Sequence, residues 1–312
     1  MDTFGIVVEQ IGLFVVYILA GVALVKTKVF CAETLEVLAK YVLKLGLPVL
    51  IFINTVNGVQ RETLFSSAEV IALTAVLYAF FFLESLFLVK VFRLKGNTAL
   101  VYRAISMFGN IGFMGIPIIS SIYPQSGMLY ISLVTIVDQS VLWTLGVKLT
   151  TPEGAEGGFK LKKMINPATT AIALALVFII ARIPVPGVIN TGLQKIGGTA
   201  TPLAMIYLGG VFACMDIRRY AFRPELYGIV LVKMLVAPIL VYLVLGFVPI
   251  SADLRMTIAL LTALPAMASA VMMAKASGSE GDYAMGGIFV TTIGSIVTLP
   301  IVCWLLQHFF TV

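Results

Sequence analysis

The chain has 312 residues, of which 60% are hydrophobic and 12% are charged, and its mean hydropathy is +1.06. A typical soluble domain carries about 25% charged residues, so this composition excludes a water-soluble globular protein and a disordered chain. A membrane-spanning helix needs about 20 apolar residues. The chain therefore has room for about ten spans and for no sizeable soluble domain.

Apolar runs separated by short polar breaks predict ten helical spans. The runs are too long for the strands of a membrane barrel and lack strict alternation, and backbone in lipid must bond within its own helix. The first run follows Met1-Asp2-Thr3, which has no positive charge, so we expect a retained helix and not a cleaved signal peptide. In chain order the predicted spans are 4–25, 35–56, 68–91, 99–121, 127–147, 165–182, 194–214, 225–246, 255–276 and 284–309.

The longest polar connection, 148–164, divides the chain into two halves, 1–147 and 165–312, with five predicted spans each. An odd number of spans per half gives the halves opposite orientations, which is the layout of an inverted repeat. Weak internal similarity agrees, since Pro48 in the second span and Pro202 in the seventh are 154 positions apart. The predicted fold is an all-α polytopic membrane protein with two inverted five-helix repeats.

Lysine and arginine predict the orientation of the chain. With the N-terminus outside, 16 of the 21 basic residues fall in or beside cytoplasmic connections, 148–164 included, and four fall on the other face. With ten spans, both termini are then external. The net charge of +6 and the pI near 9.2 are thus explained by topology, and no nucleic-acid partner is expected. The four exceptions are Arg61, Arg182, Lys195 and Arg255, and Lys233 lies within a span.

Two predicted spans carry helix-breaking residues near their centres. The fourth reads SMFGNIGFMGIPII and the ninth reads LTALPAMASAVMMAKASG. Gly109-Asn110 and Pro265-Ala266 lie 156 positions apart, nearly the same offset as the proline pair. Proline and glycine predict breaks here, and matched breaks point to a transport site. The second half-helices, beginning near Asn110 and Ala266, would present amide-rich N-termini suited to a carboxylate. The alternative is that these residues serve only packing and kinks.

Asp138-Gln139 lies halfway along the fifth span. A carboxyl group in the membrane is a candidate functional group by default, so Asp138 is expected to carry a coupling proton or to contact a coupling Na⁺. The alternative is a structural hydrogen bond or ion pair. Gln139, like Asn110, can both donate and accept hydrogen bonds to a substrate. Weaker candidates, which often bond their own backbone, are Asn54, Thr55, Thr201, Thr291, Thr292 and Ser295, while Glu84 and Lys233 are intramembrane groups without an assigned role.

Several segments in this order resemble the auxin efflux carrier family, which joins plant PIN-type carriers with bacterial malonate and malate permeases. They are LGLPVLIF (45–52), GNIGFMGIPII (109–119), VDQSVLW (137–143), INPATTAIALAL (165–176), ATPLAMIYLGGVFA (200–213) and ALPAMASAVMMAKASG (263–278). The resemblance implies ten helices in inverted repeats, with helices 4 and 9 broken and crossing. It also implies a scaffold made of helices 1, 2, 6 and 7, and roles for Asn110, Pro265 and Gln139 at the crossing.

The leading hypothesis is a secondary transporter that moves a small organic anion, a mono- or dicarboxylate, by alternating access in the cell (plasma or inner) membrane. A channel or uniport facilitator of the same fold is the alternative. An enzyme is disfavoured because the only histidine is His308 and no H-E-x-x-H is present. The three cysteines lack metal-ligand spacing. No metal and no cofactor beyond a coupling H⁺ or Na⁺ is expected, and a second copy of the chain is left open as a partner.

Overall fold

The computed structural model describes residues 3–124, 126–154 and 166–308. These residues form helices, and their only β-type pairing is an isolated antiparallel bridge between Gly109 and Ala266. Most of the predicted connection 148–164, including Lys160, Lys162 and Lys163, lies outside the described residues.

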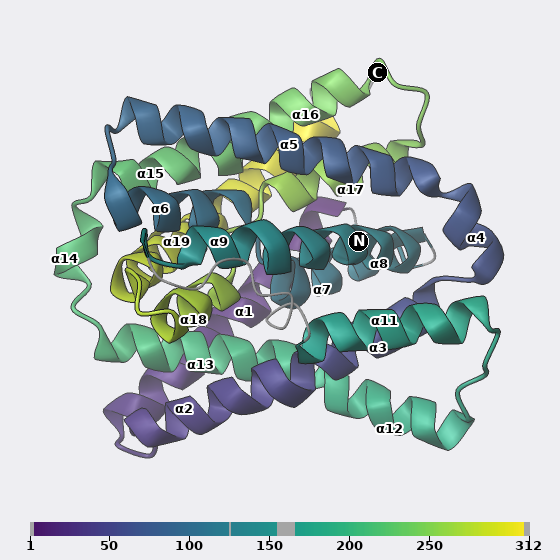
Figure 1. Ribbon diagram of the computed structural model, residues 1–312, viewed down its shortest axis with the longest axis horizontal. Helices are drawn as coiled ribbons and strands as arrows, with labels where there is room; N and C mark the ends of the chain where they lie inside the picture. The colour runs from purple at the N-terminus through teal and green to yellow at the C-terminus, as the bar shows by residue number, and fades with distance from the viewer. Residues whose placement is uncertain (1–2, 125, 155–165, 309–312) are drawn as a thin grey trace.

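The first half of the chain runs as helices joined by short turns (Figure 1). In the described residues, four π-helical segments, labelled η, are inserted in helical runs. In the first half the elements are α1 (Thr3–Lys26), α2 (Ala32–Tyr41), η1 (Val42–Gly46), α3 (Leu47–Gly58), α4 (Arg61–Ser66), α5 (Ala68–Val91), α6 (Gly96–Met107), η2 (Ile111–Gly115), α7 (Ile116–Ile122), α8 (Ser126–Val141), η3 (Leu142–Gly146) and α9 (Val147–Thr150).

The second half has a similar order of elements and also contains an interrupted helix. Its elements are α11 (Pro167–Ile180), α12 (Gly187–Gly198), α13 (Ala200–Cys214), α14 (Arg218–Ala221), α15 (Pro224–Leu231), η4 (Val232–Val236), α16 (Ala237–Leu245), α17 (Ala252–Thr262), α18 (Ala268–Ala276) and α19 (Gly281–His308).

Six helical runs in the described part of the chain are long and apolar enough to cross a membrane. They are Thr3–Lys26, Ala68–Val91, Ser126–Thr150, Gly187–Cys214, Pro224–Leu245 and Gly281–His308. The other four predicted ranges are helical too. Two of them, 99–121 and 255–276, are interrupted near their centres, 165–182 contains the 14-residue α11, and 35–56 carries several charged residues. The seventh predicted range begins too late, because α12 extends the helical run back to Gly187.

Three of the π-helical segments end two residues before a proline. These prolines are Pro48, Pro117 and Pro238, each at the second position of the helix that follows. Proline has no N–H and its ring clashes with the preceding turn. A local widening of the helix relieves this clash without ending the span. The helical runs therefore stay continuous through these prolines.

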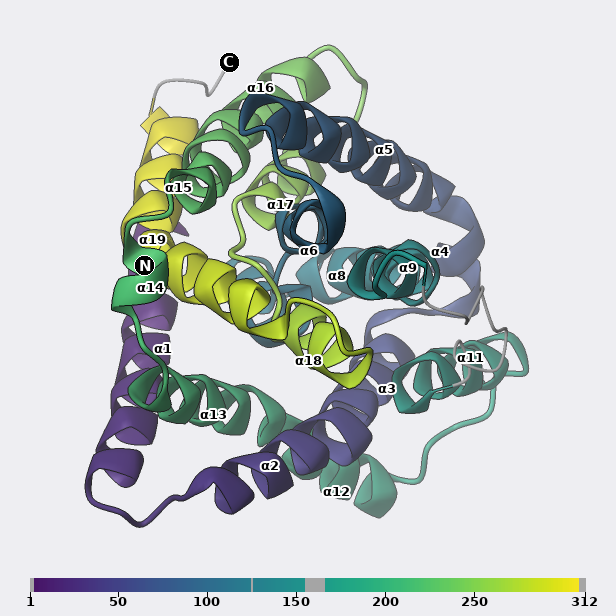
Figure 2. The ribbon, with the colours of Figure 1, turned by 60° about the vertical axis from the view of Figure 1, so that its left-hand side comes forward.

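The helices pack as two groups, which Figure 2 separates. In the lower part of that view, α1 packs against α13, and α3 packs against α11 and α12. In the upper and central part, α5 packs against α6 and α8, while α15 and α18 pack against α19. The groups also touch, since α1 contacts α7 and α19. The broken helices belong to the upper group.

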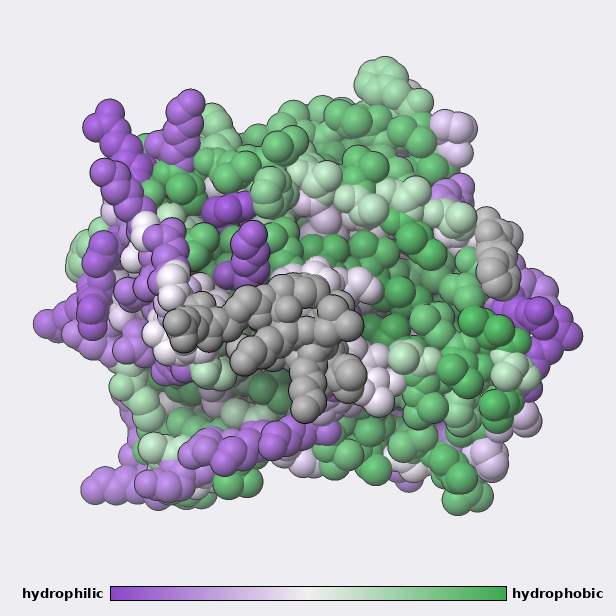
Figure 3. All heavy atoms as spheres, viewed as in Figure 1, coloured by the Kyte–Doolittle hydropathy of each residue, from purple (hydrophilic) through white to green (hydrophobic). Residues whose placement is uncertain are grey.

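The surface has an apolar band between two polar ends (Figure 3). Hydrophilic residues gather over α14 and α2 at the left of the view and around α4 at the right, and hydrophobic residues cover the middle. Large exposed apolar side chains include Val76, Leu83 and Phe87 on α5 and Val244 on α16. Such a belt is the surface expected of a protein surrounded by lipid.

The contact between α1 and α13 depends on glycine. A Cβ atom added at Gly209 would lie 2.0 Å from the carbonyl oxygen of Ile18, and one at Gly21 would lie 2.0 Å from that of Ile206. The two backbones therefore touch directly, as small residues allow between membrane helices. This contact ties the first helix to the second half of the chain.

We predict that Gly209→Ala lowers the stability by about 1–3 kcal/mol, because the added methyl group forces two backbones apart. Thermal unfolding of the purified protein in detergent measures this as a lower Tm. Gly12→Ala in α1 is the matched control, since nothing lies within 4 Å of a Cβ there. Equal Tm values for the two variants would contradict the packing described.

Candidate functional site

The two interrupted helices cross through their broken segments. The α6 helix ends at Met107 and helical structure resumes at Ile111, while α17 ends at Thr262 and α18 begins at Ala268. The amide of Asn110 donates to the carbonyl oxygen of Pro265 at 2.8 Å. The amide of Met267 donates to the carbonyl oxygen of Phe108 at 3.1 Å. Each broken segment thus satisfies backbone groups of the other, which isolated helices cannot do.

Local chemistry explains both breaks. At Asn110 the backbone forms a tight turn (φ −77°, ψ 59°), in which the amide of Ile111 donates to the carbonyl oxygen of Gly109 at 2.8 Å. A Cβ at Gly109 would lie only 3.3 Å from that of Leu264, so the small residue permits the close crossing. Pro265 has no amide to continue α17. The second half of that helix begins at Ala268, two residues later than predicted, because the chain stays extended through Met267.

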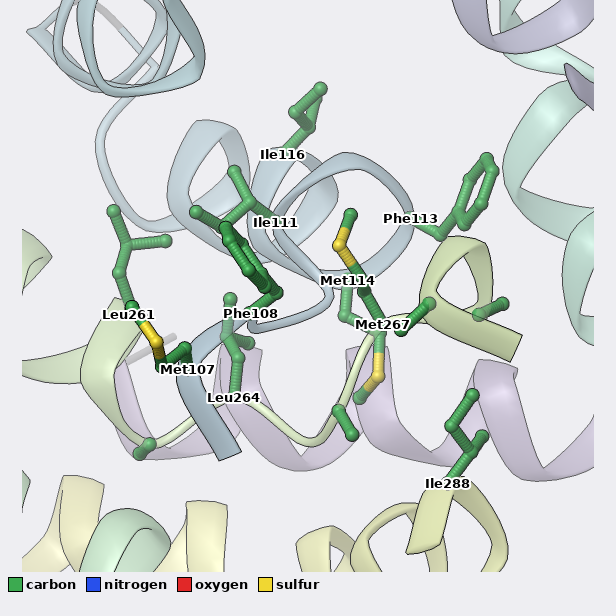
Figure 4. Close-up of a cluster of buried hydrophobic side chains, with 14 of the residues drawn as sticks. Met107, Phe108, Ile111, Phe113, Met114, Ile116, Leu261, Leu264, Met267 and Ile288 are labelled. Carbon is green, nitrogen blue, oxygen red and sulfur yellow. The ribbon is translucent and has the colours of Figure 1, made fainter. Parts of the chain in front are cut away.

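Apolar side chains surround the crossing (Figure 4). The labelled cluster lies around both broken segments and consists of carbon and sulfur atoms alone. Its labelled members are Met107, Phe108, Ile111, Phe113, Met114, Ile116, Leu261, Leu264, Met267 and Ile288. Electrostatic interactions are stronger in such surroundings than in water. A polar ligand here would depend on few groups, each with a large effect.

Asn110 is the polar side chain that the crossing itself carries. Its exposed fraction is 2%, and its side chain does not cap the helix that follows. Its carbonyl oxygen accepts bonds from the amides of Met114 and Gly115, both at 3.0 Å. No hydrogen bond joins its side-chain amide to another residue in the described ranges. An amide that bonds no other residue of the described ranges keeps its donors and its acceptor for a ligand.

Ala266 has a partner that the sequence did not reveal. Its amide donates to Oγ1 of Thr291 at 3.1 Å, and the Thr291 hydroxyl donates to the carbonyl oxygen of Gly287 at 2.8 Å. The sequence ranked Thr291 as a weaker candidate that bonds its own helix. It does so, and it also fixes the crossing to α19. The amide of Ala266 is therefore already satisfied.

Asp138 and Gln139 form a second buried cluster, with exposed fractions of 0% and 4%. The hydroxyl of Tyr78 on α5 donates to Oδ1 of Asp138, and Nε2 of Gln139 donates to Oδ2 at 2.8 Å. Nε1 of Trp143 donates to Oε1 of Gln139 at 3.1 Å. Trp143 is one helical turn from Gln139, a spacing that the sequence displays. Tyr78 comes from another helix and leaves no such signal.

The crossing and the Asp138–Gln139 cluster are neighbours, but no hydrogen bond joins them in the described residues. The ring of Tyr78 lies 5.8 Å from that of Phe108, measured between centroids, so one aromatic contact connects Asp138 to the crossing. The structure brings together Gly109, Asn110, Pro265 and Ala266 on one side. Asp138 and Gln139 form the second cluster, in which the Gln139 side chain donates a hydrogen bond to Asp138.

The crossing is closed to water in this conformation. Asn110 and Ala266 are 2% and 1% exposed. A cavity of about 460 Å³ opens at the surface. Its charged and phenolic lining includes Arg219, Tyr220, Arg223, Lys275, Glu280, Asp282 and Tyr283.

Long apolar helices and a crossing of two broken helices define a multi-pass, all-helical membrane protein. The chain belongs to the membrane transport protein family, whose sequence model matches it twice, over residues 6–158 and 156–303. This match confirms the resemblance to auxin efflux carriers that the sequence motifs indicated.

Similar proteins carry transporter names. The uncharacterized transporter YfdV of Escherichia coli K12 is 22% identical over 299 residues, which cover 92% of this chain and 93% of the relative. An uncharacterized transporter of Methanothermobacter thermautotrophicus is 26% identical over 197 residues, covering 62% of this chain and 63% of the relative.

We predict that Thr291→Val destabilises the protein by about 1–3 kcal/mol, because the buried amide of Ala266 loses its acceptor. Thr292→Val is the matched control. Thr292 follows Thr291 on the same helix and is 3% exposed. Its hydroxyl has no partner in the described residues. The Tm of both variants in detergent checks this. A Thr291→Val protein as stable as the control would refute the role given to Thr291.

Proposed function

We propose that the protein is a secondary transporter for a small organic anion, a mono- or dicarboxylate, which binds at the crossing of the two broken helices. The observation that carries this proposal is the buried, unbonded amide of Asn110 at the start of a half-helix. Helix N-termini favour negative charge. The half-helices beginning at Ile111 and Ala268 both start beside the crossing, where a carboxylate would find donors from two sides.

The proposed architecture has ten spans in two inverted five-span repeats, residues 1–147 and 165–312, joined by the connection 148–164. The two matches of the family model support it, because each covers about one half. Each half also contains one helix broken near the crossing. The charge distribution supports external termini and a location in the plasma or inner membrane.

Alternating access is the proposed mechanism. The scaffold would consist of α1, α2–α3, α11 and α12–α13, which pack on one another, and the transport domain of the remaining helices. Movement between the two groups would open the crossing to one side at a time. The closed state of Asn110 favours this carrier over a channel, which needs a continuous pore.

A coupling ion would act beside the substrate and not within its site. Asp138 is one aromatic contact away from the crossing, through Tyr78 and Phe108. This location suits a group whose occupation by H⁺ or Na⁺ biases the movement of the transport domain.

Asn110→Ala is expected to weaken substrate binding by about 10- to 100-fold, because a hydrogen bond to a charged group contributes about 1.5–3 kcal/mol. A thermal-shift screen of the purified protein against carboxylates, amino acids and indole acids first supplies the ligand, since binding raises the Tm. Titration of that ligand then compares Asn110→Ala with Asn57→Ala, an asparagine whose bonds are to Asn190 at the surface. Equal affinities would sink the proposed site.

The proposed orientation places Cys31 and Cys214 in the cytoplasm, since each follows an odd-numbered span. Both are exposed, and Cys303 is buried. In right-side-out spheroplasts, a membrane-impermeant maleimide should label neither exposed cysteine until the membrane is permeabilised, and then both. Variants with one exposed cysteine replaced by serine separate the two signals. Labelling of either site in intact spheroplasts would contradict this orientation.

A further inference from the structure

Two charged side chains of opposite sign are buried among α5, α8 and η4 without hydrogen-bond partners. Glu84 on α5 is 7% exposed and Lys233 on η4 is 0% exposed. Within the described residues, the two carboxylate oxygens of Glu84 make no hydrogen bond. The same is true of Nζ of Lys233. Nζ of Lys233 faces the ring of Phe81, 5.5 Å from its centroid. Buried ionisable groups of this kind are expensive and mark functional sites in membrane proteins.

Lys233 lies beside the part of α5 that carries Glu84 and Tyr78, because the Phe81 ring that it faces is three residues from each of them. It interacts electrostatically with Glu84 and with Asp138. No ion pair within 4 Å joins Lys233 to either group in the described residues. The three groups therefore interact through longer-range electrostatics and not through a direct salt bridge. One cation therefore serves two potential anions.

Charge balance in an apolar region sets the number of protons. With both carboxyl groups ionised the three residues carry −1, and with both protonated they carry +1. One retained proton makes the cluster neutral, which is the state that a low-dielectric region favours. As long as Lys233 is charged, neutrality therefore requires one carboxyl proton in the cluster.

Hydrogen bonding decides which carboxyl group holds that proton. Asp138 receives donors from Tyr78 and Gln139, which stabilise its ionised form. Glu84 receives no donor in the described residues. We propose that Glu84, Lys233 and Asp138 form one proton-binding site, in which Glu84 holds the exchangeable proton and Asp138 is the anion that balances Lys233.

Further ionisable groups face this site from the packed helices. Tyr78 reaches Asp138, and Tyr102 on α6 interacts with the charges of Glu84 and Glu225. The Tyr102 hydroxyl donates to the carbonyl oxygen of Glu225 at 2.9 Å. Arg103 on α6 donates through Nε to Ser85 at 3.3 Å, beside Glu84.

This series of groups continues to the surface. Oε1 of Glu225 accepts from the hydroxyl of Tyr283 at 3.4 Å and lies 3.8 Å from Nη1 of Arg223. Both Tyr283 and Arg223 line the cavity of about 460 Å³. Ionisable side chains thus extend from an open cavity to Tyr102, which interacts with the charge of Glu84.

Only the role of this site depends on the proposed function, because its role would be to couple proton binding to transport. Its occupancy is measured without substrate, by infrared difference spectra of the protein in liposomes between about pH 5.5 and 9, where exposed carboxyl groups stay ionised. We expect the carbonyl band of one protonated, buried carboxyl group, and its loss in Glu84→Gln. Glu69→Gln, an exposed position at the start of the same helix, is the control and should keep the band.

The lysine supplies the second arm of the test. Lys233→Met removes the cation and should move the titration of the band upward by about 1–3 pH units. Lys233→Arg retains the charge and should stay near the parent, which separates loss of charge from misfolding. A band that persists in Glu84→Gln, or a titration that Lys233→Met leaves unchanged, would overturn the proposal. Either result would leave the Asn110 experiment unaffected, so the two proposals fail separately.

Discussion

The pairing of two broken backbones is the interaction on which the rest of the molecule depends. An interrupted helix inside a membrane leaves amide and carbonyl groups that neither lipid nor the helix can satisfy. Here the hydrogen bonds from Asn110 to Pro265 and from Met267 to Phe108 satisfy part of that demand, and Thr291 satisfies Ala266. Neither broken segment is tolerable without the other. The crossing therefore fixes how the two halves of the chain meet.

The same constraint concentrates polar chemistry in a few places. Around the crossing, the apolar cluster of Figure 4 leaves the Asn110 side chain as a buried group without a bond in the described residues. One aromatic contact away, Asp138 is bonded by Tyr78 and Gln139, and Lys233 provides a positive charge. The proposed anion site thus lies next to the proposed proton site. Because no direct bond joins them in the described residues, each could be occupied separately, while a movement of the shared helices would affect both.

The sequence predicted the breaks because they arise from local chemistry. Pro265 lacks an amide and Gly109 lacks a side chain, whatever surrounds them. It also indicated Asp138 and Gln139 as candidates, since polar residues stand out in an apolar span, and their role stays a prediction. It did not predict that Gln139 is occupied by Asp138 and Trp143, which leaves Asn110 as the freer amide. Those bonds depend on how side chains turn within and between helices.

Partners from distant helices could not be found from one sequence. The contact of Thr291 with Ala266 spans 25 positions and that of Tyr78 with Asp138 spans 60, and neither follows a periodic pattern. Glu84 and Lys233 were visible as charges within spans, but only the packing of α5 and η4 around Asp138 gives them a common role. The start of α18 at Ala268 likewise depends on Met267, which bonds to Phe108 across the crossing.

Hydrogen–deuterium exchange with and without a stabilising carboxylate tests the central claim most directly. If the crossing is the binding site, the ligand should slow exchange together in peptides that cover residues 108–115 and 265–270. These segments are far apart in the chain and adjacent in the fold. Protection confined to the surface cavity around Arg219 and Lys275, with no change in either segment, would contradict the account.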